Sequence, residues 1–138
     1  MGYVEKDFLM RYFNQLGMVL AKILGLKGQG KFEEANRVIE DSMADFGLKI
    51  PEEYLLPDDS FFIAEITGPN GLNKDQIKVL SEFLFEKGDI KRISGDEDSA
   101  RKYFSRTLIL LEYLTNIENV FSFEREDRIQ WINSYLSN

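Results

Sequence analysis

The stretch from Leu80 to Leu114 limits the possible folds more than any other part of the sequence. On both sides of Gly95, apolar residues recur every three or four positions, the spacing that places them on one face of an α-helix. Gly95 permits a tight turn between two such helices. Asn73 and Gln76 have the spacing of a capping box, so the first helix is expected to begin there. The sequence therefore predicts an antiparallel helical hairpin over about 73–117.

Another hairpin is predicted earlier in the chain, over about 7–47. Asp7 is expected to cap its first helix, and the apolar residues from Phe8 to Leu24 cover a wide arc of that helix. Because the arc is so wide, we expect this helix to be contacted on two sides, as an inner helix of a stack. The second helix is predicted from Lys31 to Phe46, where Gly47 stops it. Three glycines are expected to end the first helix: Gly25, Gly28 and Gly30.

All three prolines of the chain fall between these hairpins, in a segment over about 48–72. Proline cannot continue a helix, so this segment is predicted to be an insert with one short helix, between Pro57 and Thr67. Beyond the second hairpin, Ser122 is expected to cap a final helix over about 122–137. Together these features predict an all-α protein with a single domain over 1–138 and about five to seven helices.

The second hairpin carries a spaced set of residues that is typical of a known repeat. Gly88, Ala100 and Phe104 stand where the tetratricopeptide repeat (TPR) has its glycine, its small residue and its following aromatic. A weaker echo has Ala35 as the small residue and Gly30 as the glycine of the turn. The chain therefore resembles the TPR superfamily over about 16–46 and 80–114. This resemblance implies a right-handed stack of antiparallel helical hairpins that binds peptides along the concave surface formed by the first helix of each hairpin.

Two further comparisons with known families add no activity. One TPR subgroup grips a terminal carboxylate with Lys and Asn, but the matching places here hold Leu20, Leu24, Phe85 and Asp89, so that property is not carried over. The opening of the chain also resembles a small bacterial family of uncharacterised function, through the residues Asp7, Arg11, Gln15, Leu16 and Gly17 and the run Ala21–Gly25.

Composition excludes several kinds of chemistry. The chain has no cysteine and no histidine, which removes thiolate catalysis, the usual general base and nearly all zinc sites. Its net charge of −7 provides no overall attraction for nucleic acid or anionic lipid. Charged residues interrupt its most apolar segment, and its start lacks the pattern of a secretion signal. We therefore expect a cytoplasmic protein with no cofactor that binds neither nucleic acid nor membrane.

Two groups of residues are candidates for partner binding. One is the apolar run of the insert, and the other is a basic segment over 87–106 in which six basic residues exceed four acidic ones, giving a net charge of +2. The alternative for the first group is that it fills the groove of its own domain, and for the second that it is a solvated helix face with local ion pairs. The candidates are Phe61, Phe62, Ile63, Lys87, Lys91, Arg101 and Lys102.

The sequence leaves three classes of function open. The first is a non-catalytic module that binds a protein or a peptide, which rests on the TPR resemblance. The second is a hydrolase that uses carboxylates or a metal ion, for which Glu33, Glu34, Glu40 and Asp41 are available without any histidine. The third is a structural homodimer that pairs through the groove or through the final helix with Trp131. Carboxylates that converge in one pocket would favour the second class over the first.

Overall fold

The computed structural model describes residues 2–48 and 59–138 and, within them, six α-helices and no strand. The predicted all-α class is therefore confirmed for this part of the chain. None of these helices combines the length and apolar character that crossing a membrane requires. The helices are α1 (Gly2–Gly28), α2 (Phe32–Asp45), α3 (Asp59–Thr67), α4 (Lys74–Ile93), α5 (Glu97–Glu118) and α6 (Phe123–Ser137).

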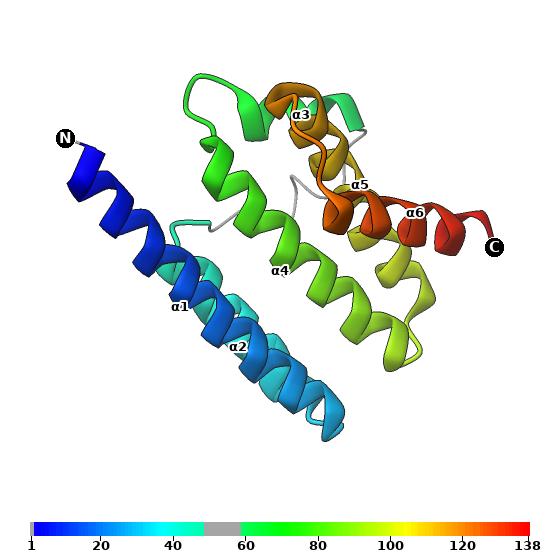
Figure 1. Ribbon diagram of the computed structural model, residues 1–138. Coiled ribbons are helices and arrows are strands. Elements are labelled where there is room, and N and C mark those ends of the chain that lie inside the picture. The colour runs from blue at the N-terminus through cyan, green and yellow to red at the C-terminus, as the bar shows by residue number, and fades with distance from the viewer. Residues whose placement is uncertain (1, 49–58) are drawn as a thin grey trace.

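The helices form two antiparallel hairpins and one further helix beside them. Helices α1 and α2 pair with each other, as do α4 and α5, and α2 packs against α4 to join the two pairs. Helix α6 packs against α5, and the short helix α3 also lies on α5. Figure 1 shows α4 in the middle of the molecule, with the α1–α2 hairpin on one side and α6 on the other.

Three glycines end helices in the same way, by adopting a positive φ just beyond the last turn. Gly30, Gly47 and Gly95 have φ angles of 73°, 74° and 91°. After Gly47, for example, the Leu48 amide donates to the Met43 carbonyl at 2.7 Å, which closes the end of α2. Two predictions about α1 were wrong: it begins at Gly2, so Asp7 lies inside it and is not its N-cap, and Gly25 and Gly28 lie within its span.

Side chains cap the starts of three helices, and two of these caps were predicted from the sequence. Asn73 and Gln76 form the predicted capping box at the start of α4, with hydrogen bonds of 2.9 Å and 3.0 Å between side chains and backbone amides. Asp96 accepts a hydrogen bond from the Ser99 amide at the start of α5. Ser122 caps α6 by accepting a hydrogen bond from the Arg125 amide at 3.2 Å, which confirms that prediction.

The core between α4, α5 and α6 is built around Phe104. A Cβ added to Gly88 would lie only 2.8 Å from the Phe104 ring, so the absence of a side chain on α4 is what admits this ring. The ring also packs edge-on against Trp131 and Tyr135 of α6, with centroid distances of 5.3 Å and 5.0 Å. Ala100 is fully buried on the same helix as Phe104. The close approach of α4 and α5 thus creates the surface on which α6 rests.

Helix α1 contacts both α2 and α4, as the width of its apolar arc predicted, but part of that arc stays exposed, so α1 is not an inner helix. Leu16 and Ile23 are buried against the core. Phe8 and Met18, by contrast, keep 61% and 75% of their surface exposed. Helix α1 therefore lies at the edge of the stack and presents apolar side chains to solvent.

The described part of the insert is anchored by α3. Phe62 and Ile66 of this helix are buried, and the guanidinium of Arg106 from α5 lies 5.3 Å from the centre of the Phe62 ring. Helix α3 packs against α5, the second helix of its hairpin. The other apolar cluster of the insert, Tyr54–Leu56, lies outside the described residues.

Candidate functional site

A groove of about 420 Å³ runs between α1 and α6, over α4. Helix α1 supplies one wall and α6 the other, while residues of α4 and α5 form the base. Figure 1 shows the same order, with α4 between α1 and α6. Both apolar and charged side chains line the groove: Phe13, Leu16, Lys78, Ser81, Glu82, Leu111, Leu114, Ser122, Glu124, Arg125 and Arg128.

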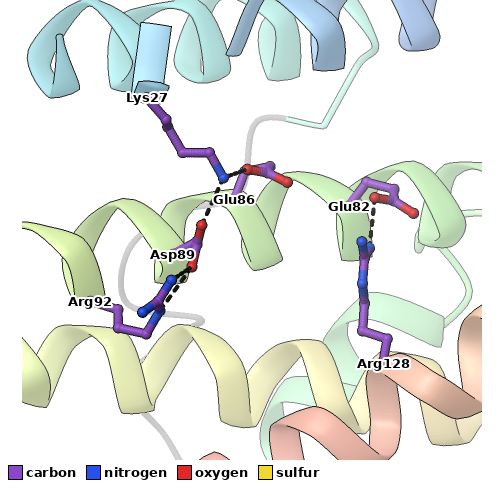
Figure 2. A network of polar contacts seen from close by, with 6 residues as sticks. All are labelled: Lys27, Glu82, Glu86, Asp89, Arg92 and Arg128. Carbon is purple, nitrogen blue, oxygen red and sulfur yellow. Dashed lines mark hydrogen bonds and ion pairs between the residues drawn. The ribbon is translucent and has the colours of Figure 1, made fainter. Parts of the chain in front are cut away.

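An acidic row on α4 pairs with basic residues from both walls. Glu82, Glu86 and Asp89 follow one another at helical spacing, so they share one face of α4. Figure 2 shows Lys27 of α1 reaching Glu86 and Asp89 from one side, and Arg128 of α6 reaching Glu82 from the other. The Lys27–Asp89 and Arg128–Glu82 contacts are 2.8 Å and 2.7 Å long. These ion pairs tie the two walls to the helix between them.

The pair of Lys27 with its carboxylates is buried and held in its charged form. Burial tends to lower the pKa of Lys27, but the hydrogen bonds to Asp89 and Glu86 outweigh it, so the pKa is raised above its ordinary value. Burial tends to raise the pKa of Asp89, but the hydrogen bonds from Lys27 and Arg92 outweigh it and the pKa is lowered. A charged group buried this way is stabilising only while its partners stay in place.

At the other end of α4, three cations surround the single carboxylate of Glu118. Lys78 lies 2.8 Å and Lys74 3.4 Å from one carboxylate oxygen, and Arg125 of α6 pairs with the other. The hydrogen bond from Lys78 is the largest influence on this group, burial opposes it, and the hydrogen bond from Arg125 adds to it. Together they lower the pKa of Glu118 to about 2. This end of the groove is therefore rich in positive charge.

Cation–π contacts join α4 and α6, one made by an arginine of each helix. The guanidinium of Arg128 lies 4.1 Å from the centre of the Phe85 ring, in addition to its ion pair with Glu82. The guanidinium of Arg92 lies 5.7 Å from the Trp131 ring. Such cation–π contacts restrict the motion of long side chains.

Exposed apolar side chains flank the groove on both sides. On the α1 side, Phe13 lines the groove and Phe8 lies further along the same helix, with 61% of its surface exposed. On the α6 side, Phe121 and Phe123 adjoin the lining residue Ser122, contact each other at a centroid distance of 4.8 Å, and are 67% and 77% exposed. Exposed aromatic side chains next to a groove are a common feature of protein-binding surfaces.

The basic residues proposed from the sequence do not form one surface. Lys87 is buried, pairs with Glu40 of α2 and lies 5.6 Å from the Tyr103 ring. Arg101 donates hydrogen bonds to the carbonyls of Tyr135 and Leu136, the latter at 2.5 Å, at the end of α6. Both side chains therefore connect helices to one another. Lys91 and Lys102 remain partly exposed on α4 and α5.

The three apolar candidates of the insert are also separated. Phe62 is buried against α5, whereas Phe61 keeps 42% of its surface exposed. Ile63 lines a more open hollow of about 520 Å³ on the outer side of α5, together with Leu108, Ile109 and Leu136. None of the three candidates lines the groove between α1 and α6.

The groove itself was missed from the sequence. Of the acidic row at 82, 86 and 89, whose spacing is visible in the sequence, only Glu82 lines the groove. The contribution of α6 could not be found in this way, because its contacts with α4 join residues far apart in the chain, such as Arg128 and Glu82.

Among the side chains that the structure describes, in residues 8–48 and 60–138, no three acidic groups come together in a way that could hold a metal ion. Comparisons of the chain with protein-family models, with curated proteins and with solved structures found no match.

Proposed function

We propose that this chain is a non-catalytic interaction module of TPR-like type that binds a peptide segment of a partner protein. The observation that carries the proposal is the groove between α1, α4 and α6, with its apolar and charged lining. In a stack of helical hairpins, the first helix of each hairpin faces the concave side. Helices α1 and α4 are first helices of their pairs, and α6 takes the place of the next one.

The packing around Phe104 supports the TPR-like part of this proposal. In that architecture a small residue allows two helices to approach, and a large residue contacts the next unit. Here Gly88 admits the Phe104 ring, and the same ring contacts Trp131 and Tyr135 of α6. The pattern that suggested the resemblance therefore coincides with the residues that seat α6 against the second hairpin.

Selection from a displayed library of short random peptides tests the binding role. Peptides recovered with the full chain should bind the groove, so Phe13→Ser should weaken them by roughly tenfold, the usual effect of truncating a contact residue of moderate importance. Leu24→Ser is the matched control, because Leu24 is an exposed apolar residue of the same helix that does not line the groove. Chemical-shift changes should map to α1, α4 and α6. Equal affinity for both variants and the unaltered chain would rule out the groove as the site.

A homodimer is the second candidate function, and the exposed apolar residues of α1 favour it. Phe8, Leu9, Met10 and Phe13 are all exposed on this helix. A contact between two copies would bury them, as it buries exposed apolar surface in general. Sedimentation over a range of micromolar concentrations distinguishes the two candidates. A dimer that dissociates on Phe8→Ser would favour the structural role, whereas a monomer throughout would leave the peptide-binding role.

A further inference from the structure

We infer that the groove selects peptides in which an aspartate or glutamate side chain accompanies apolar residues, and that the cations around Glu118 bind this carboxylate. The inference rests on the proposed function and names the chemistry of the partner. The carboxylate would meet Lys78 and Arg125, which both line the groove, with Lys74 beside them.

The cluster has more positive charge than its own carboxylate can neutralise. Lys74, Lys78 and Arg125 all pair with Glu118, so three positive charges face one negative charge within the cluster. Lys78 and Lys74 keep 33% and 50% of their side-chain surface exposed, while Glu118 keeps only 12%. The two lysines are thus more accessible from solvent than the carboxylate that they share, whereas Arg125, at 13%, is as buried as Glu118. The net charge of these four residues is therefore +2, before the other charged residues of the lining are counted.

The donors of the cluster have unused capacity. An ammonium group has three N–H donors and a guanidinium has five, whereas one carboxylate offers about four acceptor positions in total. Hydrogen bonds between charged partners are stronger than those between neutral groups. A ligand carboxylate can therefore join the cluster without displacing Glu118.

The charge of the groove differs in sign from that of the whole chain. Its lining contains three basic residues, Lys78, Arg125 and Arg128, and two acidic ones, Glu82 and Glu124, which leaves one positive charge. Adding Lys74 and Glu118 from the cluster preserves that balance. The chain as a whole carries −7. A locally positive groove on an acidic protein directs an acidic segment to this site and repels it elsewhere.

Apolar lining residues supply the other half of the preference. Phe13 of α1, 37% exposed, is the accessible apolar residue of the lining, while Leu16, Leu111 and Leu114 are buried at its base. Side chains such as Leu or Phe from a partner would lose their contact with water against them. The occupant that fits both parts of the groove is an acidic peptide that also carries apolar residues.

The composition of selected peptides tests the inference first. Among peptides recovered from a random displayed library, those selected by the unaltered chain should be enriched in Asp or Glu beside apolar residues. The enrichment should disappear when the library is selected with the K78A/R125A variant. The matched control is K22A/R37A, which removes the same charge from two exposed positions of α1 and α2. Groove-binding peptides without acidic enrichment would overturn the inference and leave the proposed function standing, whereas failure to recover any peptide would overturn both.

The second test compares two changes that should shift the affinity for an acidic peptide in opposite directions. The best selected peptide and its Glu→Gln counterpart are labelled and titrated by fluorescence anisotropy. K78A/R125A should weaken the acidic peptide by roughly tenfold and leave the Gln peptide unchanged. Glu118→Gln should strengthen the acidic peptide several-fold, because the cations lose their internal partner. Equal affinity for the two peptides, or weaker binding by a folded Glu118→Gln protein, would overturn the inference. In a competition titration, a single-stranded oligonucleotide that displaces the labelled peptide at a lower concentration than the unlabelled peptide does would also overturn the inference.

Discussion

At the scale of single residues, the contact between Gly88 and Phe104 gives the sharpest prediction. Gly88→Ala should gain about 1 kcal/mol of helix propensity but place a methyl group 2.8 Å from a buried ring. Overpacking of this kind costs about 1–3 kcal/mol, so the expected net loss of stability is up to about 2 kcal/mol. Thermal unfolding followed by circular dichroism measures it.

Gly25→Ala is the control for that substitution. Gly25 also lies inside a helix, but a Cβ there meets nothing within 4 Å. This variant should therefore keep the propensity gain and unfold at a higher temperature than the unaltered chain. If Gly88→Ala were stabilised to the same extent, the Phe104 ring would have room to move and the close approach of α4 and α5 would not depend on Gly88.

Residues that act on their own neighbours were predictable from the sequence. Gly47, Gly95, Asn73 and Ser122 end or begin helices through hydrogen bonds within a few positions of themselves. Lys87 was not predictable in this way, because its partner is Glu40, which lies 47 positions away. From the sequence alone, a lysine that is buried against a neighbouring helix cannot be distinguished from one that is exposed to solvent.

At the scale of elements, the attachment of α1 to α4 depends on Lys27. The Lys27 side chain is 8% exposed and pairs with both Glu86 and Asp89. Lys27→Met should leave these carboxylates without their partner from α1, and breaking a buried pair in this way costs about 3–5 kcal/mol. Urea unfolding measures the loss.

The control for Lys27→Met is Lys22→Met on the same helix. Lys22 is exposed, so this change should alter stability by less than about 0.5 kcal/mol. A small effect of Lys27→Met as well would show that the carboxylates find other partners or water when the lysine is removed, and that apolar packing alone holds α1 in place.

Helix α1 also shows where periodicity stops being informative. The pattern from Phe8 to Leu24 correctly predicted a helix, because a helical period follows from the local chain alone. It did not predict which part of the arc would be covered. That depends on the neighbouring helices, and here the core covers Leu16 and Ile23 while leaving Phe8 and Met18 exposed.

At the scale of the whole molecule, the all-α class could be predicted and the groove could not. Two hairpins, a short helix after Pro57 and a final helix follow from glycines, prolines and apolar spacing. The groove requires the direction of α6 relative to α4. That direction is set by contacts such as Phe85 with Trp131 and Arg128 with Glu82, between residues distant in the chain. No local pattern contains this information.

Acid unfolding is the prediction that belongs to the molecule as a whole. The folded structure holds the pKa of Glu118 at about 2, mainly through the hydrogen bond from Lys78, against an ordinary value of 4.5. The stability that this group contributes is complete above 4.5 and is lost as the pH falls from there towards 2. Asp89 acts in the same direction, because the hydrogen bonds from Lys27 and Arg92 outweigh its burial and lower its pKa. Between pH 7 and the acid limit the chain exchanges its net charge of −7 for one approaching +17, the number of its lysines and arginines, so positive self-repulsion grows as the carboxylates are protonated. The free energy of unfolding in urea should therefore fall steeply between pH 4.5 and the acid limit.

The Glu118→Gln variant tests the part played by this group. It should be less stable than the unaltered chain at pH 7 but should lose less stability on acidification, because its amide does not titrate. If the difference between the two proteins were constant across that range, Glu118 would not be held in its charged form by the cations around it, and the positive end of the groove would lose its physical basis.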